Sequence, residues 1–368
     1  MICRRIELEN FRNIKEAGVD FCEGVNILVG DNGEGKTNLL EAIGCASFGK
    51  SFRGADEGEM ITLGEDFSRI SVFFRDSLRE QNITLVSSRL KKRQVKLNHV
   101  NIRRMSDMVG AMTTVVFCPE HLSIIKDGPA ARRNYIDVAI SQLRPLYIAS
   151  LQRYNHILKQ RNKLLRDAIE DRKTFDETID FWSEQLAGEA AVIASMRADY
   201  IKRAEKYVAA FFAEMTGGDE TPTLRYSGSS HDEEEFYSDR DAVKKRYMTL
   251  LSSSHEREIA AGSTLWGIHK DDIEVSLNGN PARIYASQGQ QRSLSLALKL
   301  TEGEICREER GEYPVFLLDD VLSELDSGRR SYLINEIRGR QVIMSSCESL
   351  PYSDAHVIKV ERGFYAPL

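Results

Sequence analysis

The segment Gly30-Asp31-Asn32-Gly33-Glu34-Gly35-Lys36-Thr37 decides the fold of this 368-residue chain. It fits the pattern G-x-x-x-x-G-K-[ST], in which glycines let backbone N–H groups wrap phosphates, the lysine reaches the β- and γ-phosphates, and the hydroxyl holds Mg²⁺. The apolar run Val25–Val29 before it predicts a buried strand. The segment Asn38–Ile43 after it predicts a helix that points its N-terminus at the phosphates. We therefore expect an α/β P-loop fold in which residues 30–38 bind ATP with Mg²⁺.

A second motif, far along the chain, supplies the carboxylates that a P-loop needs. Pro314-Val315-Phe316-Leu317-Leu318-Asp319-Asp320 predicts a buried strand that ends in two acids. We expect Thr37 to offer its hydroxyl to Mg²⁺, Asp319 to hold the ion through water, and Asp320 to orient or deprotonate the attacking water. Lys36, Asp319 and Asp320 are thus predicted catalytic residues. In many P-loop NTPases this strand follows the loop by about 30–100 residues, so the distance here indicates two catalytic halves split by an insertion.

The segment Ser287-Gln288-Gly289-Gln290-Gln291-Arg292 precedes an apolar helical pattern at Leu294–Glu304. Ser287 stands where a helix N-cap belongs, and a simple cap is one interpretation. The other is the S-x-G-Q signature of ABC ATPases, which addresses the γ-phosphate of a nucleotide held by another subunit. The P-loop and the acidic strand favour the second interpretation, in which Ser287, Gly289 and Gln290 bind nucleotide and Ser287 is catalytic. Leu322–Asp326 looks like an ABC D-loop, a segment that runs along a dimer interface.

The sequence between the two halves has the pattern of long helices. Apolar residues recur at helical spacing from Leu143 to Ile169 and from Phe175 to Met215, after which Gly217-Gly218 ends the pattern. Two such helices in succession predict an antiparallel hairpin. We expect an ABC/SMC-like ATPase head made of residues 1–118 and 263–368. A helical arm domain of residues 119–262, the hairpin plus an acidic loop, splits that head.

Composition limits the other functions. No apolar run approaches the roughly 20 residues of a membrane span, and the N-terminus lacks the apolar stretch of a signal peptide. We therefore expect a cytoplasmic protein with no membrane partner. Six cysteines without a CxxC pair predict isolated buried thiols rather than a zinc site or a disulfide framework.

Nucleic-acid binding is not indicated by the net charge of −6 and would need a local basic patch. One stretch is free of acidic residues and contains Arg89, Lys91, Lys92, Arg93, Lys96, Arg103 and Arg104. It is either a solvated hairpin edge protected by lysines or a surface that contacts DNA.

Together, these residues resemble the RecF family of bacterial recombination mediators over essentially the whole chain. Besides the motifs above, the resemblance rests on Asn10–Asn13, Phe117–Leu122 with Arg132-Arg133, Tyr154, Gln160–Asn162 and Gly267–Asp272. It implies an ATP-dependent homodimer around two nucleotides that binds single-stranded, double-stranded and gapped DNA. It further implies recombinase loading with the partners RecO and RecR, replication-fork maintenance and SOS induction. It also suggests that Arg12 contacts nucleotide and that Glu120 occupies a Q-loop position, although a surface ion pair explains either residue.

The chain departs from the family pattern at several positions. Ile268-His269-Lys270 stands where the family often has Pro-His-Arg, and lysine lacks the planar fork of arginine. His121 stands where an acid is common. No histidine stands directly after the predicted strand Val342–Met344, where transporter-type ABC proteins place one, which leaves Ser345 or Ser346 as a weaker sensor of the γ-phosphate. With Asp320 in place of the more usual Glu, we expect a weak, DNA-stimulated ATPase that acts as a conformational switch.

Three other functions fit parts of the sequence. A transporter-type ATP-binding subunit is disfavoured by the distant motifs and the predicted helical hairpin. A structural SMC-like linker is disfavoured by the shortness of the arm. An SMC-like nuclease would need an additional cluster of metal-binding carboxylates or a nuclease domain.

Overall fold

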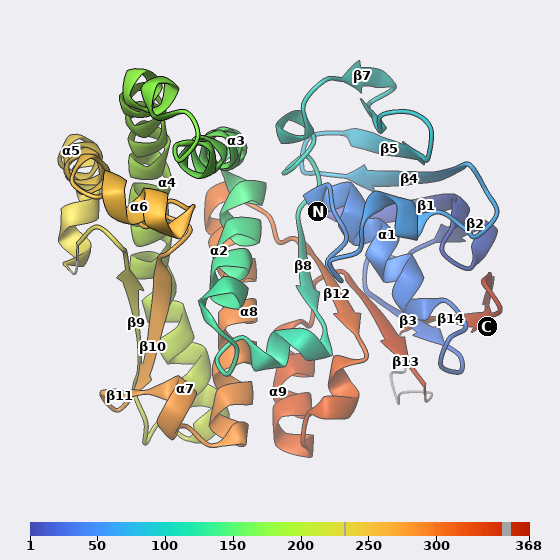
Figure 1. Cartoon of the computed structure of the whole chain (residues 1–368). Coiled ribbons are helices and arrows are strands. Elements are labelled where there is room, and N and C mark those ends of the chain that lie inside the picture. Colours follow the sequence, from blue (N-terminus) through green and yellow to red (C-terminus); the bar gives the residue numbers. More distant parts are fainter. Residues whose placement is uncertain (232, 348–354) are drawn as a thin grey trace. The chain divides into compact units, whose positions relative to one another are not determined.

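The computed structural model describes residues 1–231, 233–347 and 355–368. Its contacts divide the chain into two compact units (Figure 1). We call them the head unit, which comprises Met1–Ser123, Glu214–Gly217 and Ser295–Leu368, and the arm unit, which comprises Ile124–Ala213 and Gly218–Leu294.

A mixed, mostly parallel sheet forms one layer of the head unit, with the strand order β15-β14-β3-β13-β12-β8. Its strands are β3 (Val25–Val29), β8 (Thr114–Phe117), β12 (Val315–Asp319), β13 (Val342–Ser346), β14 (His356–Glu361) and β15 (Phe364–Pro367). All neighbours run parallel except β15, which returns antiparallel to β14. Every residue of β8 and β12 is buried, as expected for continuous apolar strands in a sheet covered on both faces. The strands predicted before the P-loop and before Asp319 are therefore confirmed.

An antiparallel sheet forms the second layer, with the order β2-β1-β4-β5-β6-β7. Its strands are β1 (Ile2–Phe11), β2 (Ile14–Asp20), β4 (Phe67–Arg75), β5 (Glu80–Ser88), β6 (Gln94–Leu97) and β7 (Val100–Ile102). Asn98 and His99 both have positive φ between β6 and β7, which makes a tight two-residue hairpin. Helix α1 (Lys36–Phe48) contacts strands of both sheets and buries most of its residues, so the P-loop helix is held between two layers.

Short helical segments complete the head unit. They are η1 (Glu57–Met60), η2 (Met105–Asp107), η3 (Pro119–Ser123), η5 (Val321–Glu324), α9 (Ser327–Glu336) and the C-terminal part of α8 (Gln288–Arg310). Helix α9 was not predicted. Its start is nevertheless marked by an N-cap: the Asp326 side chain accepts a hydrogen bond from the N–H of Arg329 at 3.0 Å.

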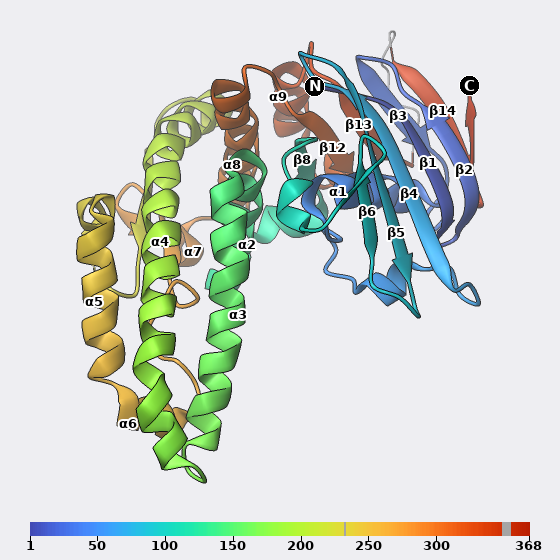
Figure 2. The same cartoon turned by 90° about the horizontal axis from the view of Figure 1, so that it is seen from above.

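The arm unit is mainly helical. Its helices are α2 (Pro129–Leu143), α3 (Pro145–Asp167), α4 (Arg172–Thr216), α5 (Arg240–Ser252), α6 (His255–Ala261) and α7 (Ala282–Tyr285), with η4 (Glu234–Ser238). Helices α3 and α4 are antiparallel as predicted, since Arg153 bonds Glu189 while Arg161 bonds Ser183 (Figure 2). The unpredicted helix α2 ends at Leu143, because the proline that begins α3 favours an extended backbone at Arg144.

A small antiparallel sheet belongs to the same unit, in the order β11-β10-β9. Its strands are β9 (Pro222–Ser227), β10 (Asp272–Leu277) and β11 (Asn280–Pro281). Because β10 pairs with β9, residues 263–294 group with the arm unit, whereas we expected them in the head. The predicted division into three domains itself stays a prediction, and Asp232 of the predicted acidic loop lies outside the described residues.

Charged side chains occur along the whole 45-residue helix α4. In the part of the chain that the structure describes, no helix combines the length and the apolar character that crossing a membrane requires.

Candidate nucleotide site

Three segments that are distant in sequence meet at one edge of the parallel sheet of the head unit. The P-loop follows β3, the two acids end β12, and Ser345 to Cys347 end β13. The ladder aligns Ser345 with Asp319 and Ser346 with Val29, so all three strands end at the same level. In sheets of this kind, ligands bind beyond the carboxyl ends of the strands.

Asp319 is the meeting point of these segments. Its Oδ1 accepts hydrogen bonds from the Thr37 hydroxyl at 2.7 Å and from the Ser345 hydroxyl at 2.9 Å. Burial raises the pKa of the Asp319 carboxyl, and the two hydroxyl donors oppose that shift. A hydroxyl and a carboxylate oxygen side by side are the hard ligands that Mg²⁺ prefers, so the residues present fit a magnesium ion. The structure thus brings Thr37 and Asp319 together, although the two lie 282 positions apart, and their role toward Mg²⁺ stays a prediction.

The lysine and the glycines of the P-loop form a cradle for phosphate. The buried Lys36 points its ammonium group at the backbone carbonyls of Gly30 and Asp31, the latter at 3.0 Å. A Cβ atom added to Gly30 would lie 2.2 Å from the carbonyl oxygen of Val360. Gly35 has a φ of +116°, which residues with a side chain rarely adopt. Glycine is therefore needed at both positions. With this backbone, the N–H groups of the loop can bind a polyphosphate.

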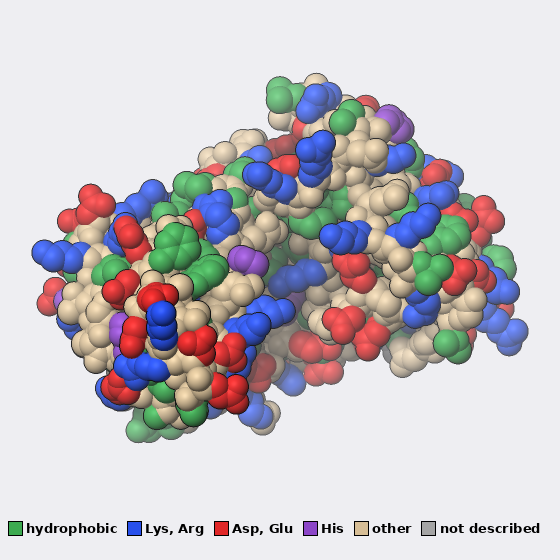
Figure 3. Space-filling view, turned by 45° about the horizontal axis from the view of Figure 1, so that its top comes forward, with side chains coloured by type: hydrophobic (Ala, Val, Ile, Leu, Met, Phe, Trp, Pro, Cys, Tyr) green, Lys and Arg blue, Asp and Glu red, His purple; other side chains and the backbone are tan. Residues whose placement is uncertain are grey.

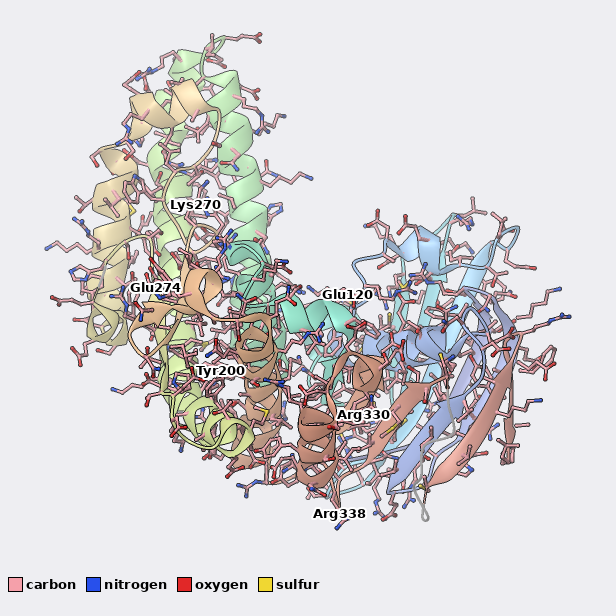
Figure 4. All side chains as sticks on the ribbon, turned by 90° about the horizontal axis from the view of Figure 1, so that it is seen from below. Glu120, Tyr200, Lys270, Glu274, Arg330 and Arg338 are labelled. Atoms are coloured by element: carbon pink, nitrogen blue, oxygen red, sulfur yellow. The ribbon has the colours of Figure 1, made fainter. Side chains whose placement is uncertain are left out.

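The backbone of Asp320 and of the segment after it is held by hydrogen bonds with side chains. The Asp320 N–H donates to the Ser345 hydroxyl at 2.9 Å, and the residue has a φ of +50°. Arg330 on α9 donates from Nε to the carbonyl of Leu322 at 3.1 Å and from Nη2 to that of Leu325 at 3.4 Å (Figure 4). The D-loop-like segment is thus held against its own following helix. The role of Asp320 toward water stays a prediction.

Arg12 makes an ion pair inside the head unit. Its guanidinium bonds both carboxylate oxygens of the fully buried Glu41, at 2.7 and 2.9 Å, and donates to the carbonyl of Glu59 at 3.0 Å. Arg12 therefore makes an ion pair, though with a buried partner rather than at the surface as expected, and a contact between Arg12 and nucleotide stays a prediction. Glu120 lies on η3 with an exposed side chain (Figure 4), and its Q-loop role is likewise a prediction.

Ser287 begins helix α8 within the arm unit. Its hydroxyl accepts from the N–H of Gln290 at 3.3 Å, while the Gln290 side chain accepts from the N–H of Ser287 at 2.6 Å. This reciprocal pair is a capping box, so the helix-cap interpretation is confirmed. Ser287 is exposed and Gly289 half-buried, at the N-terminus of a 23-residue helix. A second role for Ser287, Gly289 and Gln290 at the nucleotide of another subunit stays a prediction.

Two of the seven basic residues of the predicted patch are engaged in the head unit. Arg89 donates to the carbonyl of Glu65 at 3.0 Å, and Arg93 donates to that of Gly49 at 2.6 Å. The other five are exposed and, over the described ranges 1–231, 233–347 and 355–368, make no side-chain hydrogen bond or ion pair: Lys91, Lys92, Lys96, Arg103 and Arg104. We call these five the basic hairpin. Figure 3 shows Lys and Arg side chains on this end of the unit.

Three residues that were not predicted as site residues touch the P-loop, although Asn13 belongs to a segment that carried the family resemblance. The Asn13 side chain donates to the carbonyl of Gly33, and the Tyr365 hydroxyl donates to that of Gly35. The Cys347 sulfur lies 3.6 Å from the Lys36 ammonium. Our expectation of six buried thiols is wrong for Cys347, which is exposed because the chain leaves the sheet at the end of β13, and Cys22 is only half-buried.

Comparison with known sequences supports one family. The family model described as "RecF/RecN/SMC N terminal domain" matches residues 2–360. A protein of Thermoanaerobacter sp. (strain X514) is 37% identical over 363 residues, which cover 99% of each chain. A protein of Heliobacterium modesticaldum is 40% identical over 342 residues, which cover 93% of this chain and 91% of its own. Both are named "DNA replication and repair protein RecF".

Solved structures agree with this assignment. One, described as "Structure of the recombination mediator protein RecF-ATP in RecFOR pathway", is 33% identical, with a TM-score of 0.93, and covers 100% of this chain and 97% of its own. An SMC head domain of Pyrococcus furiosus, solved with the C-terminal domain of ScpA, is 13% identical with a TM-score of 0.55 over 100% and 96% of the two chains. At that identity the second likeness concerns the fold alone.

Proposed function

Because this chain belongs to the RecF family of SMC-type ATPases, we propose that it is an ATP-dependent DNA-binding protein of recombinational repair. One observation carries the proposal of an ATP site: the Thr37 hydroxyl lies 2.7 Å from the Asp319 carboxylate, beside a phosphate cradle. The similar structure described as RecF-ATP supports the same ligand.

Each residue of the site has a proposed task. Lys36 would exchange its contacts with the loop carbonyls for contacts with phosphate oxygens, and the loop N–H groups would hold the same phosphates. Thr37 and Asp319 would hold Mg²⁺, which supplies charge neutralisation on the phosphates when bound. Asp320 would orient the attacking water. Aspartate is shorter than glutamate, so we propose slow hydrolysis that serves as a switch.

The signature residues suggest that the site is completed by a second copy of the chain. Ser287, Gly289 and Gln290 lie at the accessible N-terminus of α8, where the N–H groups of the first turn and the helix dipole favour an anion. We therefore propose a two-fold dimer with two composite sites that forms when ATP binds.

The proposed output of the dimer is DNA binding. The basic hairpin offers five exposed positive charges, which suit phosphate contacts that depend on salt and not on base sequence. Preference for gapped DNA, stimulation of hydrolysis by DNA, cooperation with RecO and RecR, fork maintenance, SOS induction and a cytoplasmic location follow from the family and complete the proposal.

Substitution of Ser287 tests the composite site. We expect Ser287→Asp to abolish ATP-dependent dimerisation, because aspartate preserves the N-cap but repels the γ-phosphate. Binding of ADP should change by less than about twofold, since the P-loop is untouched. Dimerisation is measured by analytical ultracentrifugation with ATP, and gapped-duplex binding by fluorescence anisotropy.

The exposed Ser252→Asp on α5 is the matched control and should dimerise like the wild type. A Ser287→Asp protein that still dimerises with ATP would overturn the composite-site model. Dimerisation and DNA binding that are independent of ATP in the wild type would overturn the proposed switch.

Ser345 provides a second prediction, because its hydroxyl joins Asp319 to the backbone of Asp320. Ser345→Ala leaves the Asp319 carboxylate short of one donor, and hydrogen bonds to charged groups are each worth about 1.5–3 kcal/mol. We expect the rate of ATP hydrolysis to fall by about tenfold, with a higher Mg²⁺ concentration needed for half-maximal rate. Ser345→Thr keeps the hydroxyl and should restore both. An unchanged Mg²⁺ dependence in Ser345→Ala would contradict the assigned role.

A further inference from the structure

Three consecutive carbonyl groups of the phosphate loop are held from outside the loop. The carbonyl of Gly33 accepts from the Asn13 side chain at 3.2 Å, that of Glu34 accepts from the N–H of Gly363 at 2.8 Å, and that of Gly35 accepts from the Tyr365 hydroxyl at 2.9 Å. Gly35 also accepts the first backbone bond of α1, from Leu39 at 3.1 Å. Each of these three carbonyls therefore has a hydrogen-bond donor that lies outside the loop.

Two of these hydrogen-bond donors, the Gly363 N–H and the Tyr365 hydroxyl, belong to the hairpin β14–β15. Strand β14 lies parallel to β3, in register from His356 opposite Asn26 to Lys359 opposite Val29. The hairpin turns at Arg362 and Gly363, which both have positive φ, as a two-residue turn needs. A Cβ atom on Gly363 would lie 3.1 Å from the carbonyl oxygen of Asn13, so the turn packs closely against the residue that holds the Gly33 carbonyl.

The geometry of the peptide bond links these contacts to nucleotide binding. A peptide unit is planar and trans, so its C=O and N–H point in opposite directions. When the carbonyls of Glu34 and Gly35 are held toward the hairpin, the N–H groups of Gly35 and Lys36 are aimed to the opposite side. These are the donors that a P-loop offers to phosphates. Fixing the carbonyls therefore orders the phosphate donors in advance and lowers the entropy lost on binding.

Tyr365 suits this task for a further reason. A phenol is protonated at physiological pH, and burial raises the pKa of Tyr365 further, so its hydroxyl is available as a donor. Its oxygen would lie 3.0 Å from a Cβ atom on Gly35, so the ring is packed against the loop.

We propose that the C-terminal hairpin β14–β15 presets the phosphate loop for nucleotide, with Tyr365 and Asn13 as positioning residues that never touch the nucleotide. The inference rests on the proposed ATP site, and it adds a C-terminal element to a loop that lies near the N-terminus. ADP is the sharpest probe, because the loop holds the phosphates that ADP shares with ATP, and ADP avoids both hydrolysis and the second subunit.

The test compares ADP affinity by isothermal titration calorimetry in full-length protein. We expect Tyr365→Phe to weaken ADP binding by about threefold to tenfold, because it removes one hydroxyl donor and keeps the ring. Asn13→Ala should weaken binding to a similar extent. Phe364→Ala is the matched control: its side chain is 75% exposed on the same strand, and the change should leave the affinity unaltered.

Thermal unfolding without nucleotide separates positioning from stability. The midpoint of Tyr365→Phe should stay within about 3 °C of the wild type, while the ADP affinity falls. Equal ADP affinity in Tyr365→Phe and wild type overturns the inference, and so does a loss equally large in Phe364→Ala. A wild-type protein that binds neither ADP nor ATP overturns the proposed function instead.

Discussion

Lys36→Met should lower both the affinity for ADP and the rate of ATP hydrolysis by at least about 100-fold. Lys36 is buried in the loop, with its ammonium group aimed at the carbonyls of Gly30 and Asp31. Each contact between a charged donor and a phosphate oxygen is worth about 1.5–3 kcal/mol, and Lys36 is expected to make at least two. Methionine has a similar length and no charge, so the loop loses the donor without a large cavity.

Calorimetric titration with ADP and a phosphate-release assay measure the two effects. Lys15→Met is the matched control, because Lys15 is exposed on β2, and it should behave as the wild type. Thermal unfolding without nucleotide should confirm that the variant is folded. A folded Lys36→Met protein with wild-type ADP affinity would show that the P-loop does not hold phosphate.

Arg161→Met should destabilise the arm unit by about 3–5 kcal/mol, the usual result of leaving a buried charge without its partner. The side chains of Arg161 and Glu258 are both completely buried and lie 2.6 Å apart. Arg161 also donates to the hydroxyls of Ser183 and Thr264, at 3.1 and 2.8 Å. The substitution thus leaves the Glu258 carboxylate and two hydroxyl groups without their partner.

Urea unfolding followed by circular dichroism measures this loss. The matched control is Arg172→Met, which breaks the pair of Arg172 with Glu256, whose side chains are 50% and 75% exposed. Such surface pairs contribute about 0–1 kcal/mol. The double variant Arg161→Met with Glu258→Gln should recover part of the stability, because it removes the unpaired charge. Equal losses in Arg161→Met and Arg172→Met would contradict the prediction.

The same buried network accounts for several residues that carried the family resemblance. Asn162 accepts from the backbone N–H of Thr264 at 2.8 Å, and the Tyr154 hydroxyl lies 2.7 Å from Nδ1 of His269. Burial lowers the pKa of His269 to about 4, so the ring is neutral and can accept from Tyr154 while its other nitrogen bonds the carbonyl of Thr264. These residues hold the segment before β10 in place. The neighbouring Lys270 is exposed (Figure 4), so the loss of arginine there does not disturb the network.

The sequence by itself determined the parts of this protein that depend on local pattern. The P-loop needs glycines at set spacings, a buried strand needs a continuous apolar run, and a long helix needs a repeat of 3.6 residues. Each of these is written within a few neighbouring residues. For that reason β3, β12, the α3–α4 hairpin and the cap at Ser287 were predictable, and motif chemistry proposed Thr37 and Asp319 for one magnesium site.

The tertiary structure alone decided the contacts made between distant segments. Ser345 joins both acids because β13 lies beside β12 in a particular register, and Arg12 meets Glu41 because α1 packs under β1. Likewise, Tyr365 reaches Gly35, 330 positions away in the sequence, only because β14 pairs with β3. Strand order and register are collective properties of the packed sheet. No local pattern encodes strand order or register. The phosphate loop could therefore be recognised from its own residues, whereas the distant residues that hold its backbone could not.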